Sequence, residues 1–225
     1  MPVMGGVAER RYVALLAAAF AIVWLGLAIE PRHRADWALE NVLTAIAVAL
    51  LGLTRRRVAL SRLSYTLIFL FLTLHAVGAH YTYSEVPYDA WFTALTGKSL
   101  NEALGWQRNN FDRFVHFIYG LLLTQPVREA FVRATALRGF WGYFLPMDLI
   151  MSSSATYELI EWGAAMVFGG DLGIAYLGAQ GDPWDAHKDM SLAALGALLS
   201  TAIAAAFQQW RSRKHNRLRR SSSGG

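Results

Sequence analysis

The chain has 225 residues, of which 55% are hydrophobic and only 16% are charged. A water-soluble domain carries about 45–50% apolar and ~25% charged residues, so the composition argues against a soluble fold. The net charge of +5 does not indicate nucleic-acid binding, because the basic residues form short clusters between long apolar segments, and the lack of cysteine excludes disulfides and thiolate-ligated metals.

Six apolar segments are long enough to cross a bilayer as helices. They cover residues 12–29, 37–53, 64–83, 110–131, 140–168 and 183–207. The first is interpreted as a retained helix and not as a signal peptide, since no small-residue cleavage site follows it. Pro146 indicates a kink or a late start in the fifth. The sequence therefore predicts an all-α membrane bundle of about six transmembrane helices in a single domain, 1–210, followed by a basic, disordered cytoplasmic tail, 211–225.

Lysine and arginine alternate between the loops in a way that predicts the orientation of the chain. Six of them fall in segments expected outside, namely Arg32, Arg34, Lys98, Arg108, Arg113 and Lys188. All the others fall in segments expected inside, so both termini are predicted to be cytoplasmic. The longest connection, 84–109, is expected on the extracytoplasmic side, where it has room for a short interfacial helix.

Several ionisable residues lie inside these segments, where each costs ~2.5–3.5 kcal/mol to insert and therefore needs a partner or a function. His75 and His80 come first along the chain. Their five-residue spacing places them about 140° apart on a helix, which disfavours a joint role. A structural role is expected for His75, whereas His80 is a candidate metal ligand.

Asp112 and His116 open the fourth segment at positions i and i+4, so they share one helix face. This spacing suits two ligands of one metal ion, or a carboxylate that orients a catalytic imidazole. The alternative is purely structural: Asn110 caps the helix and Asp112 answers its positive N-terminal dipole.

Glu158 and Glu161 share a face in the outer half of the fifth segment. Two carboxylates this close repel each other in a medium of low dielectric constant unless a cation or a proton lies between them. The structural alternative for this pair is an ion pair with Arg108 or Arg113 from across the bundle.

The sixth segment begins with a run of acidic residues, Asp182, Asp185 and Asp189. A helix cap explains Asp182, with Pro183 at the first helical position. Capping does not require Asp189, which lies a turn deeper on the same face as Asp185. Small residues follow at Ala193, Ala194, Gly196 and Ala197, a pattern typical of close helix packing in lipid.

The outer ends of the last three segments lie on one side of the membrane, so their polar residues are expected to meet in one cavity. Carboxylates and imidazoles of this kind hold divalent metal ions, of an identity that the sequence leaves unknown. The predicted metal ligands are Asp112, His116, Glu158, Asp185, Asp189 and His80, and the predicted catalytic residues are His116 and Glu161, the latter as general base.

Four motifs resemble the uncharacterised bacterial inner-membrane family typified by YjdF. They are HYTYSEVP, NNFDRFVHF with a following PVRE, YELIEW, and GAQGDPWDAHKDM, and they extend from about His75 to Gly196. The resemblance implies a multi-pass location in the bacterial inner membrane and the same polar positions, but no reaction. The start DRFVHF is also similar, more distantly, to VanZ-like proteins.

Three functions are compatible with these features. The first is a metal-dependent hydrolase or transferase that acts on a lipid-linked or envelope substrate. The second is a proton- or cation-coupled transporter that uses the same carboxylates, although no inverted repeat is evident. The third is a membrane scaffold whose charges are all ion-paired. The expected partners are membrane lipids and not nucleic acid, and the oligomeric state is open.

Overall fold

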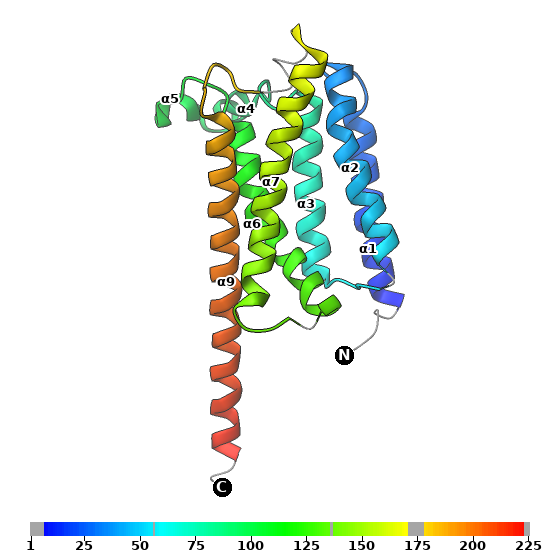
Figure 1. The fold of residues 1–225 in the computed structure, drawn as a ribbon, viewed down its shortest axis with the longest axis vertical. Helices are drawn as coiled ribbons and strands as arrows, with labels where there is room; N and C mark the ends of the chain where they lie inside the picture. The colour runs from blue at the N-terminus through cyan, green and yellow to red at the C-terminus, as the bar shows by residue number, and fades with distance from the viewer. Residues whose placement is uncertain (1–6, 56, 136, 171–177, 223–225) are drawn as a thin grey trace.

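The computed structural model describes residues 7–55, 57–135, 137–170 and 178–222, and within them it is entirely helical (Figure 1). The predicted all-α class is confirmed. The helices are α1 (Val7–Leu27), α2 (Arg34–Thr54), α3 (Arg62–His80), α4 (Tyr88–Thr96), α5 (Leu100–Leu104), α6 (Phe111–Thr135), α7 (Trp141–Phe168) and α9 (Asp185–Ser222).

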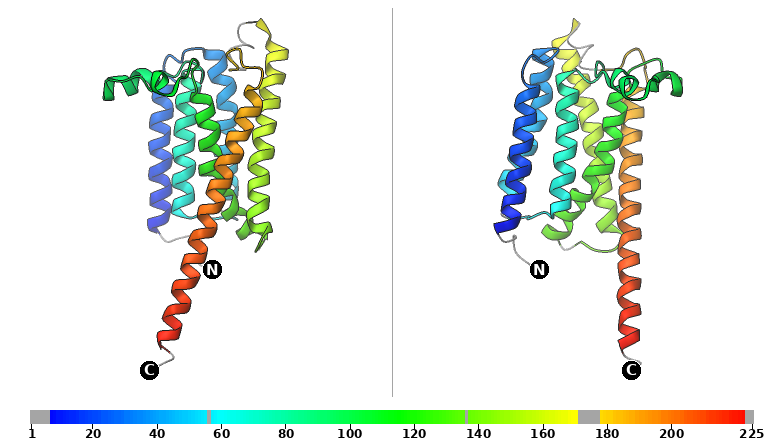
Figure 2. Two further views of the ribbon diagram at one scale, coloured as in Figure 1. Left: turned by 90° about the vertical axis from the view of Figure 1, so that its left-hand side faces the viewer. Right: turned by 180° about the vertical axis from the view of Figure 1, so that it is seen from behind.

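Six long helices run side by side, and the short helices α4 and α5 lie across one end of the bundle (Figure 2). Each predicted apolar segment overlaps one long helix. Four of these, α1, α2, α3 and the Asp185–Lys214 part of α9, are long and apolar enough to cross a membrane. Helices α6 and α7 have the length but are not among these four, so the count of six crossings stays a prediction.

Helix α9 continues to Ser222 and extends well past the other helices (Figure 1). This differs from the disordered tail expected after residue 210. The basic segment is rich in arginine, which has high helix propensity, so a helix that has already formed in the bundle continues through it.

The bundle has an inside-out distribution of polarity at α2. The residues that this helix buries are Asp36, Glu40, Asn41 and Thr44, whereas apolar residues such as Val42, Val48 and Leu53 are exposed. In water this arrangement would be unfavourable, because it buries polar groups and exposes apolar side chains to the solvent. In a bilayer it is the expected one, since the exposed face meets lipid.

Helices α6 and α9 approach most closely, along a seam of small residues. A Cβ added to Gly120 would lie 2.8 Å from the backbone nitrogen of Ala197, and one added to Gly196 would lie 2.7 Å from that of Leu121. Ala193 and Ala197 are fully buried in this seam. Because His116 is one turn before Gly120 and Asp189 one turn before Ala193, the seam also fixes the distance between these two polar side chains.

A cavity of about 940 Å³ lies among α2, α3, α6 and α7. Its walls are almost wholly apolar, with residues such as Leu50, Ile68 and Leu123. At the end of the bundle where α4 and α5 lie, the lining becomes polar at His75, Tyr83, Asp112 and His116. The cavity therefore joins the apolar interior of the bundle to the predicted site.

Candidate metal centre

The structure gathers the predicted acidic residues and His116 at one end of the bundle. Asp112 and His116 come from α6, Glu158 and Glu161 from α7, and Asp189 from α9. All five side chains are buried or nearly so. The helices thus bring polar groups from three distant parts of the sequence into one water-poor pocket.

Asp112, His116 and Asp189 form the tightest group, with one potential ligand atom from each lying within 4.8 Å of the other two. His116 Nε2 is 3.7 Å from Asp112 Oδ1 and 3.4 Å from Glu158 Oε1. The other ring nitrogen, Nδ1, is 3.4 Å from the hydroxyl of buried Ser154. The imidazole therefore presents Nε2 to the carboxylates.

Two buried carboxylate oxygens around His116 have no hydrogen-bond partner. They are Asp189 Oδ1, within the tightest group, and Glu158 Oε1, beside it. Asp189 is only 2% exposed. A buried carboxylate without a partner is strongly unfavourable. A cation bound among Asp112, His116 and Asp189 would relieve this cost, and carboxylate with imidazole is a donor set that suits divalent metal ions.

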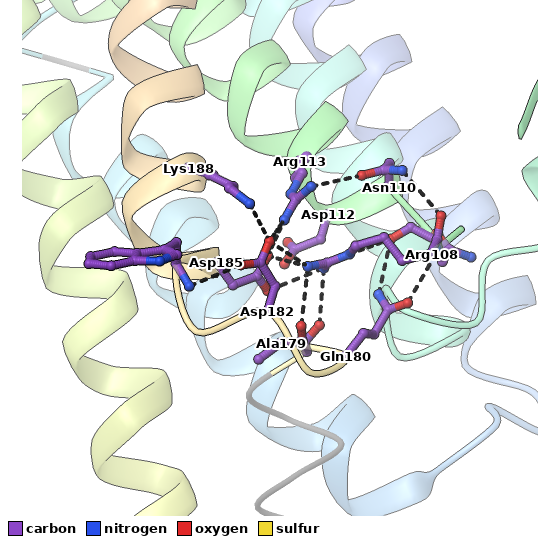
Figure 3. Close-up of polar contacts among 12 residues, drawn as sticks. Arg108, Asn110, Asp112, Arg113, Ala179, Gln180, Asp182, Asp185 and Lys188 are labelled. Atoms are coloured by element: carbon purple, nitrogen blue, oxygen red, sulfur yellow. Dashed lines mark hydrogen bonds and ion pairs between the residues drawn. The ribbon is translucent and has the colours of Figure 1, made fainter. Parts of the chain in front are cut away.

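Asp185 differs from Asp189, although the two lie on one face of α9. Its carboxylate accepts hydrogen bonds from Arg108 Nη1 at 2.5 Å and Nη2 at 3.2 Å, and from Arg113 Nη2 at 2.9 Å (Figure 3). Both of its oxygens are thus engaged by guanidinium groups. The structure places this predicted ligand in an ion-pair network beside the tightest group.

The same network ties the loop before α9 to the start of α6 (Figure 3). Arg108 also donates to the carbonyls of Gly178 and Ala179, and Gln180 exchanges two hydrogen bonds with the backbone of Asn109. Asp182 accepts from Arg113 and Lys188, each at 2.5 Å. The Lys188 ammonium and the Trp184 amide hold the pKa of the Asp182 carboxyl below its usual value, so this carboxylate stays ionised at neutral pH.

The sequence offered two structural alternatives, an ion pair between an arginine and the glutamates of α7, and a cap on α6 formed by Asn110. The structure shows neither contact among the residues it describes. Within the described residues, neither Arg108 nor Arg113 forms an ion pair with Glu158 or Glu161, because both bind Asp182 and Asp185 instead. The side chain that accepts from the Phe111 amide is Asn109 and not Asn110. Ion pairing across the bundle therefore does not account for the two glutamates.

The two histidines of α3 lie outside the tightest group. Buried His75 bonds through Nδ1 to the Tyr83 hydroxyl, and its Nε2 is 3.2 Å from the Glu40 carbonyl, in keeping with the structural role expected for it. His80, a predicted metal ligand, places Nδ1 2.8 Å from the Leu27 carbonyl. It thus fastens the C-terminal end of α1 to the end of α3.

Sequence reasoning missed the contribution of α2. Asp36 and Glu40 are buried, and the Tyr157 hydroxyl donates to both oxygens of Glu40 at 3.2 Å. Together with Asp112 and Glu161 they line a small void. The available signal was an acidic pair at i and i+4 inside an otherwise apolar segment, followed by Asn41 and Thr44 on the same face.

Comparisons with known proteins agree with the resemblance seen in the motifs. The family model described as "Predicted membrane protein (DUF2238)" matches residues 12–210. This range includes Asp112, His116, Glu158, Glu161 and Asp189. The chain is 38% identical over 192 residues to the inner membrane protein YjdF of Escherichia coli (strain K12), covering 85% of this chain and 88% of the relative. No solved structure matches. The likeness to VanZ-like proteins stays a prediction.

Proposed function

The chain belongs to the membrane-protein family described as DUF2238, and on that premise we propose that it is an integral-membrane enzyme, a metal-dependent hydrolase or transferase acting on a lipid or envelope substrate. Like its relative in Escherichia coli, it would lie in the inner membrane. Six crossings with both termini in the cytoplasm place the polar end of the bundle outside.

One observation carries the proposal: Asp112, His116 and Asp189 offer three convergent ligand atoms in a buried pocket, and an oxygen of Asp189 has no partner. We assign the metal ion to these three residues. A divalent cation bound there supplies Lewis-acid chemistry and an activated water. Asp185, which was also expected to be a ligand, instead neutralises Arg108 and Arg113 and so holds the loop before α9 in place.

The geometry favours Glu158 over Glu161 as the general base. Glu158 Oε1 lies 3.4 Å from His116 Nε2 and has no hydrogen-bond partner, so it borders the proposed ion and is free to accept a proton from the attacking water. Glu161 lines the small void together with Asp36, Glu40 and Asp112. The proposal therefore gives Glu158, which was expected to be a metal ligand, the role of general base that was expected for Glu161.

The apolar cavity supports a lipid substrate. It extends along α6 from His116 to Ala134, and these 19 residues rise ~27 Å, close to the ~30 Å of a bilayer's hydrocarbon core. Apolar walls would hold an acyl or prenyl tail, while Asp112 and His116 at the polar end would face the group that reacts.

A transporter is less well supported, because a polar path would have to continue through the inner half of the bundle. There the cavity walls are apolar, and Asp148, an acidic residue near the start of α7, is exposed. A scaffold with fully paired charges is disfavoured by the unpartnered oxygens of Glu158 and Asp189.

The experiment is a count of bound metal. The purified chain is stripped with a chelator and titrated with Zn²⁺ and Mn²⁺, and bound metal is measured by mass spectrometry after desalting. We expect Asp189→Asn to bind at least tenfold more weakly at this site, since a ligand is lost. Glu102→Gln, which removes an exposed carboxylate from α5, should leave binding unchanged. A wild-type protein that binds neither metal, nor Mg²⁺ or Ca²⁺, contradicts the proposal.

A further inference from the structure

The apolar cavity is open along one side, between α2 and α7. Four of the residues that line it are also 45–55% exposed and so stand at an opening, which we call the mouth; they are Ile46, Leu50, Leu149 and Ile160. Residues of α3 and α6 that line the same cavity, such as Leu72 and Val115, are buried. Because the exposed apolar side chains of a membrane bundle meet lipid, the mouth faces the hydrocarbon core of the bilayer.

At the polar end of the cavity, a hydrogen-bonded contact joins the two helices that border the mouth. The Tyr157 hydroxyl of α7 donates to both oxygens of Glu40 on α2, each at 3.2 Å. The Tyr157 ring also lies beside the imidazole of His116, with 5.8 Å between the ring centroids. The mouth is thus closed next to the proposed metal site and open along its apolar part.

The cavity is longer than the tail of an ordinary phospholipid. At its polar end it is lined by His75 and Tyr83, and at its other end by Val58 and Leu60, in the connection between α2 and α3. That connection lies at the opposite end of the bundle from α4 and α5 (Figure 1). One leaflet supplies half of the ~30 Å hydrocarbon core, so its chains reach ~15 Å. Such a chain, held at the polar end, would leave the inner half of the cavity without dispersion contacts.

From these features we infer that the cavity binds the tail of a long-chain prenyl lipid, which enters sideways through the mouth while its polar head reaches Asp112 and His116. The inference deepens the proposed function and rests on it, because it takes this lipid to be the substrate. A prenyl chain can be longer than a leaflet is thick, whereas the acyl chains of the surrounding phospholipids end near the midplane. The length of the cavity thus distinguishes the substrate from the bulk lipid.

The test places a photoreactive group at the inner end of the cavity. p-Benzoylphenylalanine replaces Phe131, which lines the cavity near the end of α6, in the whole chain reconstituted in phosphatidylcholine nanodiscs. The nanodiscs also contain undecaprenyl phosphate, with a tail longer than a leaflet, or farnesyl phosphate, with a short tail, or phosphatidic acid, with ordinary acyl chains. After irradiation, mass spectrometry measures the crosslinked fraction. We expect several-fold more crosslinking to undecaprenyl phosphate than to either other lipid.

Substitutions at the mouth test the sideways route. Ile46→Trp places a large ring in the opening and should lower the crosslinking to undecaprenyl phosphate several-fold. Val48→Trp is the matched control, because Val48 lies on the same helix and is 47% exposed against 49% for Ile46, but is outside the lining of the cavity. If Ile46→Trp does not fold, Leu149→Trp narrows the mouth from α7, and Met151→Trp, at the same 45% exposure, is its control.

The outcomes separate the inference from the proposed function. Equal crosslinking to the long-tailed and the acyl lipid, or equal losses in Ile46→Trp and Val48→Trp, overturns the inference. Bound metal is counted in the same preparations. Metal without crosslinking overturns the inference alone, whereas crosslinking in a chain that binds no metal overturns the proposed enzyme and leaves a site for the lipid tail.

Discussion

At the scale of single residues, Asp185 and Asp189 show what a sequence can and cannot distinguish. Both were predicted to be ligands because they lie at i and i+4 on one face. The structure gives Asp185 two arginine partners and leaves Asp189 Oδ1 with none. The difference depends on Arg108 and Arg113, which reach α9 from the start of α6 by contacts that no local pattern reveals.

This difference predicts opposite effects of two similar substitutions on the metal-free protein. Asp185→Asn breaks a largely buried ion pair and leaves Arg108 and Arg113 to share Asp182, so it should lower the free energy of unfolding by roughly 3 kcal/mol. Asp189→Asn removes an unpaired buried charge and should raise the thermal midpoint. Thermal unfolding of both variants in detergent with a chelator checks this, and shifts of the same sign would contradict the assignment.

At the scale of helices, the sequence predicted most of what the structure contains. The long apolar segments and the small-residue stripe after Asp189 identified the bundle helices and the packing face of α9. The role of α2 was not predicted, because Asp36 and Glu40 are only two acidic positions in a segment that otherwise looks like an ordinary span. Only the packing of α2 near α7 makes Glu40 a partner of Tyr157.

The seam between α6 and α9 predicts a strong effect of a single methyl group. Gly120→Ala places a Cβ against the backbone of α9, so the helices must separate, and we expect a loss of about 1–3 kcal/mol of stability together with weaker metal binding. Gly163→Ala, in α7 where nothing lies within 4 Å of the added Cβ, should be neutral or stabilising by up to ~1 kcal/mol. Thermal midpoints and metal titrations of the two variants test the seam.

At the scale of the whole molecule, the predicted orientation decides on which side of the membrane the site opens. The sequence contains no cysteine, so single cysteines can be introduced without background. In intact cells, Lys98→Cys, between α4 and α5, should react with a membrane-impermeant maleimide. Arg138→Cys, between α6 and α7, should react only after the membrane is permeabilised. The reverse pattern would place the site in the cytoplasm and remove the argument for an envelope substrate.

The position of the cavity could not have been predicted from hydropathy, because its walls are ordinary apolar residues that would equally well face lipid or another helix. It lies where residues of the inner half of α2, such as Leu50 and Leu51, line the space shared with α3, α6 and α7. Only the placement of whole helices reveals it.

The direct connection between that cavity and the carboxylates has a kinetic consequence under the proposed function. A substrate whose tail slides in among α2, α3, α6 and α7 never leaves the hydrocarbon phase, so its encounter with the protein is a two-dimensional search. Turnover would then follow the mole fraction of substrate in the bilayer and the fluidity of the surrounding lipid. Diluting the same vesicles into more buffer would leave the rate per protein unchanged.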